Sequence, residues 1–273
     1  MTGFNRGIMA VALVALGACA SAPQEAPIAT AAPDAYSGKS VLDAAIEAAG
    51  GQAALSQIKE LEWKGAATVN AEGKTTQIEL ETVVRPQSHW ARSTSWTKTD
   101  GPKKAKTIQA EQGKAWIVHV VNWTPMPEAQ AIHENQQFSL YSAMMLVGLK
   151  GDGVTVRETA PGKDGTRNLH VERPNAPPVD LRFDASGKLI QAAMTVKDAK
   201  GGADIAEVAK FSGEIVSNGV KWPKKIVIEQ NGAPYFDMEI ASFEASPATK
   251  PRPLPHTLDD GQTPPQDRPA DAG

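Results

Sequence analysis

Turn-forming segments recur about every ten residues through most of the chain, and this spacing constrains the fold more than any other feature. A segment this short between turns suits a β-strand that reverses direction at each end. The Asn-Gly pair in particular is a favoured two-residue hairpin loop. We therefore expect an antiparallel meander of about a dozen strands. The turns are Ala71-Glu72-Gly73-Lys74, Glu111-Gln112-Gly113-Lys114, Pro161-Gly162-Lys163-Asp164-Gly165, Ala185-Ser186-Gly187-Lys188, Lys200-Gly201-Gly202 and Asn231-Gly232.

Hydrophobic alternation supports the same interpretation. Ile78, Leu80 and Val84 alternate with Glu79 and Glu81 along one such segment. Successive side chains of a strand point to opposite faces, so this pattern predicts a strand with one buried face and one solvated face.

Helices are expected at two places. Ser40 is a predicted N-cap, with Asp43 three residues later, and apolar residues follow at helical spacing until Gly50 and Gly51 end the helix. A short second helix is predicted over 53–58. The longer helix is predicted over 128–147, where one side is apolar, so it is expected to cover the open side of a curved sheet. Its apolar residues are Ile132, Leu140, Tyr141, Met144 and Met145.

Composition excludes several classes of protein. The chain has 273 residues, 41% of them hydrophobic, which is enough to form a core. Its 28 Lys and Arg against 31 Asp and Glu give a net charge of −3, which argues against nucleic acid as a partner, because duplex binding needs a basic face. A single cysteine excludes an internal disulfide and a cysteine-based metal centre.

The N-terminus predicts secretion and lipid anchoring. Arg6 precedes an apolar stretch over 7–18 that is too short to span a bilayer and suits a signal peptide. The stretch ends in Leu16-Gly17-Ala18-Cys19, which resembles the lipobox of bacterial lipoproteins. That resemblance implies acylation of Cys19 and a membrane as partner through the acyl anchor. Ala20-Ser21 after the cysteine favour the outer membrane, on its periplasmic face. The alternative is an ordinary secretory signal with a chance cysteine.

Proline marks the ends of the mature domain. Residues 19–38 are rich in Ala and Pro and are predicted to be a flexible tether that follows the 1–18 signal. Residues 39–245 are expected to form one domain. Residues 246–273 are again rich in Pro and are predicted to be a disordered tail.

Two parts of the chain resemble a known family. They are Leu42 to Leu55 with Ile58-Lys59-Glu60-Leu61, and later Val179 to Asp184, Gly187-Lys188-Leu189 and Gly219-Val220-Lys221-Trp222-Pro223. They are similar to the outer-membrane lipoprotein-sorting carriers and receptors of the LolA/LolB type. The resemblance implies a mainly β fold, an antiparallel half-open barrel of about eleven strands with N-terminal helices and one covering helix. It also implies an apolar cavity for acyl chains. The loop over 98–104 lacks the exposed apolar residue of the LolB-type receptor.

No sequence motif specifies an enzyme. The chain contains no Gly-x-Ser-x-Gly elbow, Walker loop or EF-hand loop, and His133-Glu134 lacks the second histidine of a zinc protease motif. We therefore predict a protein without catalytic activity, without a metal site and without a cofactor.

Large apolar side chains are the candidate ligand contacts. Trp90 and Trp96 are six positions apart on one predicted strand, so they share a sheet face. Such rings, covered by methionines, suit a groove for chains of variable shape, but a filled core has the same signature. The predicted cavity residues are Trp63, Trp90, Trp96, Trp116, Met144 and Met145.

Two functions are compatible with these features. The first is an envelope lipoprotein that binds a lipid, or the acyl chains of another lipoprotein, in the half barrel. The second is a non-enzymatic scaffold with a filled barrel, whose loops and C-terminal tail bind an envelope protein.

Overall fold

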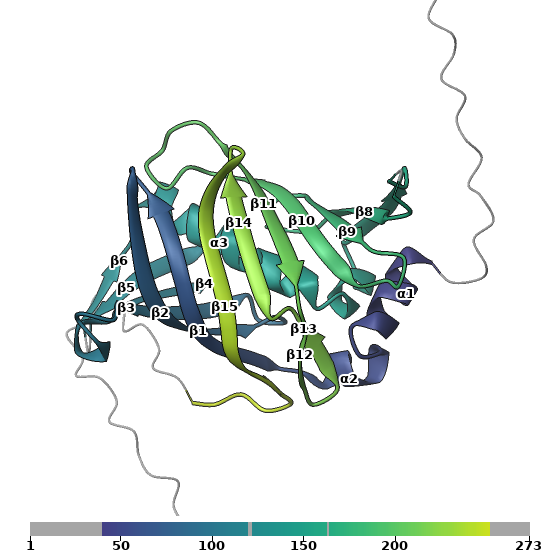
Figure 1. The fold of residues 1–273 in the computed structure, drawn as a ribbon, viewed down its shortest axis with the longest axis horizontal. Coiled ribbons are helices and arrows are strands. Elements are labelled where there is room, and N and C mark those ends of the chain that lie inside the picture. The colour runs from purple at the N-terminus through teal and green to yellow at the C-terminus, as the bar shows by residue number, and fades with distance from the viewer. Residues whose placement is uncertain (1–39, 120–121, 163, 252–273) are drawn as a thin grey trace, which may run out of the picture. The chain divides into compact units, whose positions relative to one another are not determined.

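A single antiparallel sheet of 13 strands dominates the computed structural model, which describes residues 40–119, 122–162 and 164–251 (Figure 1). The first strands are β1 (Glu60–Ala71), β2 (Lys74–Arg85), β3 (Trp90–Thr97), β4 (Lys106–Glu111), β5 (Lys114–His119) and β6 (Asn122–Pro125). The later ones are β7 (Thr155–Thr159), β8 (Arg167–Glu172), β9 (Val179–Phe183), β10 (Leu189–Val196), β11 (Ile205–Ser212), β14 (Lys225–Gln230) and β15 (Ala233–Ser246). A separate small sheet pairs β12 (Ile215–Ser217) with β13 (Val220–Trp222).

The order of the strands explains why the sheet stays open. It runs β6-β5-β4-β3-β2-β1-β15-β14-β11-β10-β9-β8-β7, so β6 and β7 are the two edges and do not pair with each other. The pairing of β1 with β15 joins the two halves. The predicted fold class is confirmed: the protein is mainly β, with a half-open antiparallel sheet, N-terminal helices and one covering helix. The sheet has more strands than the eleven that the resemblance implies.

Three α-helices accompany the sheet in the described residues: α1 (Val41–Ala48), α2 (Gln52–Gln57) and α3 (Glu128–Met144). α3 connects the edge strands β6 and β7 and contacts β2, β4, β5 and β10. Short 3₁₀ helices are η1 (Pro102–Lys104) and η2 (Val147–Lys150). The predicted long helix therefore ends at Met144, because Leu146 has a φ of 60°, which an α-helix does not allow.

Local sequence signals account for the ends of α1. Ser40 is its N-cap, and its hydroxyl oxygen accepts a hydrogen bond from the Asp43 backbone N–H at 3.1 Å, as predicted. Gly50 follows the helix with a φ of 127°. A Cβ at this position would lie 2.0 Å from the carbonyl oxygen of Gly219, so only glycine lets the two segments meet.

The predicted hairpins are also confirmed. The pairs Glu72-Gly73, Gln112-Gly113 and Asn231-Gly232 join β1 to β2, β4 to β5 and β14 to β15. Both residues of each pair have positive φ, the conformation that matches the twist of two hydrogen-bonded strands.

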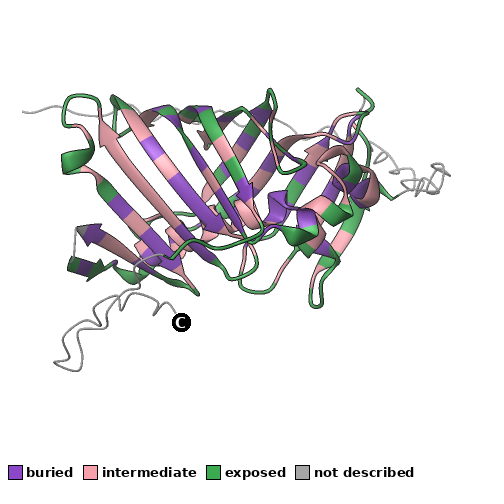
Figure 2. Ribbon diagram, turned by 90° about the horizontal axis from the view of Figure 1, so that it is seen from below, coloured by how far each residue is buried: buried purple, intermediate pink, exposed green. Residues whose placement is uncertain are grey.

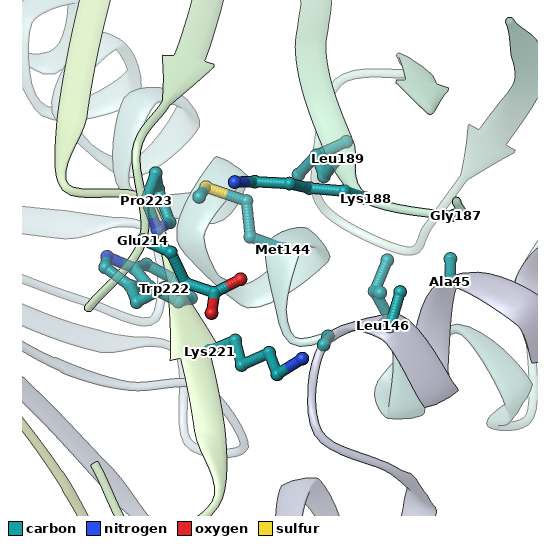
Figure 3. A pocket seen from close by; sticks show the side chains of 12 residues that line it. Ala45, Met144, Leu146, Gly187, Lys188, Leu189, Glu214, Lys221, Trp222 and Pro223 are labelled. Atoms are coloured by element: carbon teal, nitrogen blue, oxygen red, sulfur yellow. The ribbon is translucent and has the colours of Figure 1, made fainter. Parts of the chain in front are cut away.

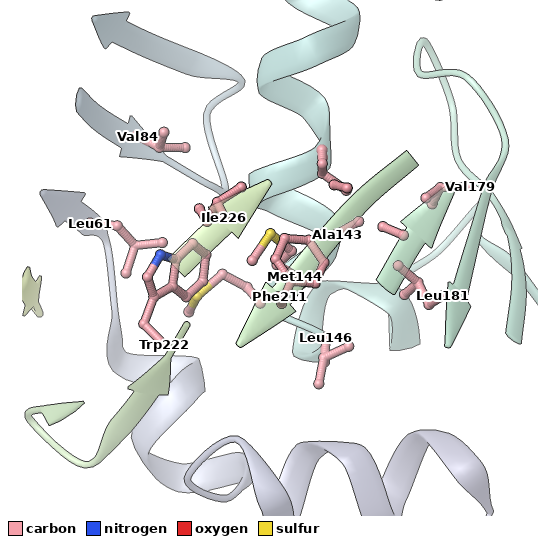
Figure 4. Packing of buried hydrophobic residues seen from close by; sticks show 14 of the residues in the cluster. Leu61, Val84, Ala143, Met144, Leu146, Val179, Leu181, Phe211, Trp222 and Ile226 are labelled. Atoms are coloured by element: carbon pink, nitrogen blue, oxygen red, sulfur yellow. The ribbon is translucent and has the colours of Figure 1, made fainter. Parts of the chain in front are cut away.

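The main core lies on the inner face of the sheet, where α1, α2 and the end of α3 cover it (Figure 4). It includes Leu61 and Val84 from the first half of the sheet and Leu181, Phe211 and Ile226 from the second. Buried positions alternate with less buried ones along β9 and β11, and Figure 2 colours the ribbon by burial. A second, smaller cluster consists of Ala110, Ala115, Met126 and Ala131.

The predictions for the termini fall mostly outside the described residues. The signal, Cys19, the tether up to residue 38 and residues 252–273 all lie there, and these stay predictions. β15 extends to Ser246, and Lys250 forms ion pairs with Glu62 and Glu244, each at 2.9 Å. Within the described ranges, no helix has the length and apolar character that crossing a membrane requires.

Candidate ligand groove

The centre of the half barrel is filled by aromatic side chains. Trp63 is 1% exposed, and its ring centroid lies 4.7 Å from that of Tyr141 and 5.8 Å from that of Trp222. Only small cavities remain there, one of about 40 Å³ beside Met144, Leu189 and Trp222 (Figure 3) and one of about 60 Å³ beside Tyr141 and Met194. Each has room for a few water molecules and not for an acyl chain.

A much larger cavity, of about 390 Å³, lies along one side of α3. Four residues of the helix line it: Asn135, Phe138, Ser139 and Ser142. Their spacing of three and four places them on one face of the helix. Across the cavity are the small side chains of Ala91 and Ala110 on β3 and β4, together with the turn between β4 and β5.

A second cavity, of about 450 Å³, adjoins the first, because His89, Ser142 and Asn175 line both. It lies between α2, the end of α3, η2 and the segment after β8. We call the two cavities together the α3 groove. The part of the second cavity formed by apolar side chains and prolines comprises Leu55, Ile58, Pro86, Met145, Val147, Leu149, Val154 and Pro174.

Small residues on the first half of the sheet leave this space open. The inner face of β3 carries Ala91, Ser93 and Ser95. That of β4 and β5 carries Ala110 and Ala115 beside the first cavity, with Ile108 and Ile117 two positions away. Alanine and serine fill little volume, so α3 packs against them through a small cluster and does not close the interior.

Side-chain hydrogen bonds to the backbone hold α3 on both sides. The Asn135 Oδ1 accepts a hydrogen bond from the Gly113 N–H at 3.1 Å, and its Nδ2 donates to the Lys114 carbonyl at 3.0 Å. On the other side, the Gln136 Oε1 accepts from the Lys197 N–H at 2.7 Å. The helix is thus attached to both halves of the sheet near its middle.

A buried acidic group faces the same helix from the second half of the sheet. Glu207 is 3% exposed and accepts hydrogen bonds from the side-chain amides of Gln137 at 2.7 Å and Gln230 at 2.6 Å. Burial, together with the nearby Glu207, raises the pKa of Tyr141. Burial also raises the pKa of Glu134 above its ordinary value.

Three of the predicted cavity residues lie in the interior. Trp63 and Met144 are in the filled centre, and Met144 contributes to the small cavity there. Met145 lines the larger second cavity. The structure therefore brings these three together with α3.

The other three predicted residues lie on the outer face of the sheet. Trp63 pairs with Thr82, and Thr82 pairs with Ser93, so these share the inner face. Trp90 and Trp96 are an odd number of positions from Ser93 and face the other way. Their even spacing does place them on one face, but that face is not the concave one. Trp90, the first residue of β3, nevertheless lines the first cavity, beside His89 and Ala91.

The register through β4 places Trp116 on this outer face as well. There its ring makes an edge contact with Trp123, with centroids 6.3 Å apart. The Arg85 guanidinium lies 4.5 Å from the centroid of the Trp90 ring. Aromatic and cation–π contacts with the protein itself thus occupy Trp90 and Trp116.

Sequence analysis missed most residues that line the groove. Phe138, Ser142, Leu55 and Arg173 were not candidates, although Phe138 and Ser142 stand in a stripe at helical spacing. In the described ranges, no three His, Cys, Asp or Glu side chains form a group that could hold a metal ion. What this arrangement can do is bury an elongated ligand beside polar groups.

Comparison with known proteins gives a relationship of fold. No protein-family model matches the sequence, and no curated protein matches it. The chain is similar to the structure of a DUF1329 family protein from Desulfovibrio piger, with a TM-score of 0.50 and 9% identity over 75% of this chain and 91% of that one. A LolA superfamily protein, NE2245 from Nitrosomonas europaea, has a TM-score of 0.47 and 9% identity over 75% of this chain and 94% of that one. LprF from Mycobacterium bovis has a TM-score of 0.32 and 13% identity over 79% and 96%.

Proposed function

We propose that this protein is an envelope lipoprotein, anchored through Cys19, that binds a lipid or an acylated protein non-covalently in the α3 groove. The observation that carries the proposal is the groove itself. Its two adjoining cavities of about 390 and 450 Å³ each fall in the size range of small-molecule sites. The wall of the larger one combines apolar side chains, such as Leu55, Met145 and Leu149, with an equal number of polar ones.

Burial of apolar surface would supply the binding energy. An acyl chain of about 14 carbons offers on the order of 10 kcal/mol, at ~0.8 kcal/mol per buried CH₂, before the cost of ordering it. Met145 gives the wall a flexible, polarisable side chain that adapts to chains of different shape. Such a mechanism needs no catalytic group, so we propose a carrier and not an enzyme.

The resemblance of Leu16-Gly17-Ala18-Cys19 to a lipobox supports the proposed location. Two or more acyl chains on the N-terminal cysteine hold a protein stably at a membrane, whereas one chain binds marginally. Ala20-Ser21 after Cys19 favour delivery to the outer membrane. The acyl anchor and the groove ligand are then different lipids with different roles.

Native mass spectrometry of the full chain carrying Cys19→Ser tests this function. The substitution removes the covalent anchor, so any lipid that copurifies from bacteria is held non-covalently. We expect a bound amphiphile in one-to-one stoichiometry, identified after lipid extraction. A clean mass that neither lipids nor an acylated peptide shift would contradict the proposal.

The filled centre around Trp63 favours one second candidate, a scaffold that binds an envelope protein through its loops and tail. Deletion of residues 252–273 separates the two, because it leaves β15 and the Lys250 ion pairs intact. The carrier predicts unchanged lipid binding after this deletion. The scaffold predicts the loss of a partner that crosslinks to the full chain in bacterial envelopes.

A further inference from the structure

Arg173 places a positive charge at the wall of the second cavity of the α3 groove. It follows β8 and lines the 450 Å³ cavity together with Leu55, Met145 and Leu149. Its Nη1 donates a hydrogen bond to the Ser139 carbonyl at 2.9 Å, and its Nη2 contacts the Ser139 hydroxyl at 3.4 Å. The Nε–H is buried and has no hydrogen-bond partner in the described part of the chain.

Arg173 also differs from other arginines of the second half of the sheet in its lack of an acidic partner. Arg157 pairs with Glu172 at 3.2 Å, and Arg182 pairs with Asp164 at 2.9 Å. No carboxylate in the described ranges lies within ion-pair distance of the Arg173 guanidinium. Burial lowers the pKa of Arg173 to about 10, which still leaves the side chain charged at neutral pH.

Arg173 is half-buried with a buried Nε, and a partly desolvated charge without a counterion is costly, so a protein normally pairs it. The contacts to Ser139 use two of the five N–H donors of a guanidinium, so Arg173 retains capacity for a further acceptor. Planar, forked donors suit a carboxylate or a phosphate, which accept two parallel hydrogen bonds. The same cavity wall offers Leu55, Met145 and Leu149, as a ligand's hydrocarbon part requires, and its polar residues include one carboxylate, Asp152.

We infer that the ligand of the α3 groove is an amphiphile with an anionic head, a carboxylate or a phosphate, which the guanidinium of Arg173 binds. This inference rests on the proposed function and narrows the class of lipid. The head lies at Arg173, and the hydrocarbon chain lies along Met145 and Phe138 toward the first cavity.

Calorimetric titration of the full chain carrying Cys19→Ser tests the inference with matched amphiphiles. Dodecanoate and dodecyl phosphate supply the two anionic heads, 1-monododecanoylglycerol an uncharged head, and inorganic phosphate the anion without a chain. We expect the two anionic amphiphiles to bind at least about tenfold more tightly than the glycerol ester, the gain expected for a charge-assisted hydrogen bond.

Two substitutions at Arg173 then test whether this side chain causes the preference for anionic heads. Arg173→Gln should weaken binding of both anionic amphiphiles at least about tenfold and leave the glycerol ester unchanged. Arg173→Lys keeps the charge and should retain part of the preference. Arg157→Gln on β7 is the matched control, because it removes an arginine whose side chain is 60% exposed, and it should change nothing. Circular dichroism and urea midpoints verify that the variants fold. The parent protein's preference for anionic heads is measured without the variants, so it tests the inference even if a variant does not fold.

Other results would overturn the inference in distinguishable ways. Equal binding of all three amphiphiles, or a preference that survives Arg173→Gln, refutes an anionic head at Arg173 and leaves the proposed function intact. Tight binding of inorganic phosphate alone would make this a site for small anions and refute the lipid assignment. Failure of every amphiphile to bind refutes the proposed function and the inference together.

Discussion

The two halves of the sheet present different inner faces to α3. The later strands contribute large apolar side chains such as Leu181, Phe183 and Phe211, all 5% exposed or less. Among the earlier strands, β1 and β2 add Trp63 and Leu80 to the same core, whereas β3 and β4 contribute only Ala91 and Ala110 at comparable depth. The later strands therefore form a continuous core with β1 and β2, while β3 and β4 of the earlier half leave the α3 groove. The contrast indicates that residue size on one half of the sheet, and not a gap between elements, makes the cavity.

The largest effect should come from emptying the packed half. Leu181 is 0% exposed on β9, so Leu181→Ala should lower the free energy of unfolding by about 2–5 kcal/mol. Ile108 is half-buried on β4 and faces the groove side. Ile108→Ala should lower the free energy of unfolding by only about 1 kcal/mol. Urea denaturation monitored by tryptophan fluorescence measures both. Equal losses would show that the two halves are packed alike and would undo the comparison.

Filling the open half should instead change binding. Ser142 lines both cavities, so Ser142→Leu would place a larger apolar side chain where they join. We expect amphiphile affinity to fall at least about tenfold, while stability changes by about 0.5 kcal/mol or less, since leucine is a good helix former. Fluorescent fatty-acid displacement measures the affinity.

The matched control for that experiment is Ser242→Leu, an exposed position on the outer face of β15. It introduces the same side chain away from the groove, so binding should stay as in the parent. If both variants bind as the parent does, the ligand does not occupy the junction at Ser142.

Features of the fold that depend on local signals can be predicted from the sequence. Turn chemistry at Gln112-Gly113 and Asn231-Gly232 and the N-cap at Ser40 are local, so they predict hairpins and a helix start directly. The even spacing of Trp90 and Trp96 also predicts that they share a face.

Which face is concave depends on pairing between strands, and alternation within one strand does not reveal it. In the β2–β3 register, Trp90 pairs with Arg85, whereas the inward-facing Thr82 pairs with Ser93. Trp90 therefore shares the outer face with Arg85. Likewise, the groove depends on small residues from β3, β4 and α3, which no local pattern brings together. Arg173 becomes a candidate ligand contact only in the structure, which places its guanidinium against Ser139 of α3.

Loosening α3 on one side should have a moderate, local effect. Asn135→Ala removes hydrogen bonds to the β4–β5 turn and should cost about 1–2 kcal/mol. Hydrogen exchange of the Gly113 amide should speed up, because that N–H loses its acceptor, while the Lys197 amide on the other side stays protected by Gln136. Uniform acceleration at both amides would mean that the two attachments open together and that the halves are not independent.

The smallest effect we predict concerns a charge on the inner side of α3. Burial raises the pKa of Glu134 above 4.5, and Glu207 adds to the rise, while His133 and Lys106 oppose it. A carboxyl whose pKa is raised by folding contributes stability that is present below the unfolded value and is lost as pH increases through the folded value. Glu134→Gln, which stays neutral, should therefore be more stable than the parent at pH 7 and equal to it below about pH 4. Urea midpoints at several pH values measure the difference, and Glu128→Gln in the first turn of α3 is the exposed control. A gain that does not depend on pH would point to packing instead of charge, and a parent more stable at pH 7 would show that Lys106 and His133 outweigh burial at this position.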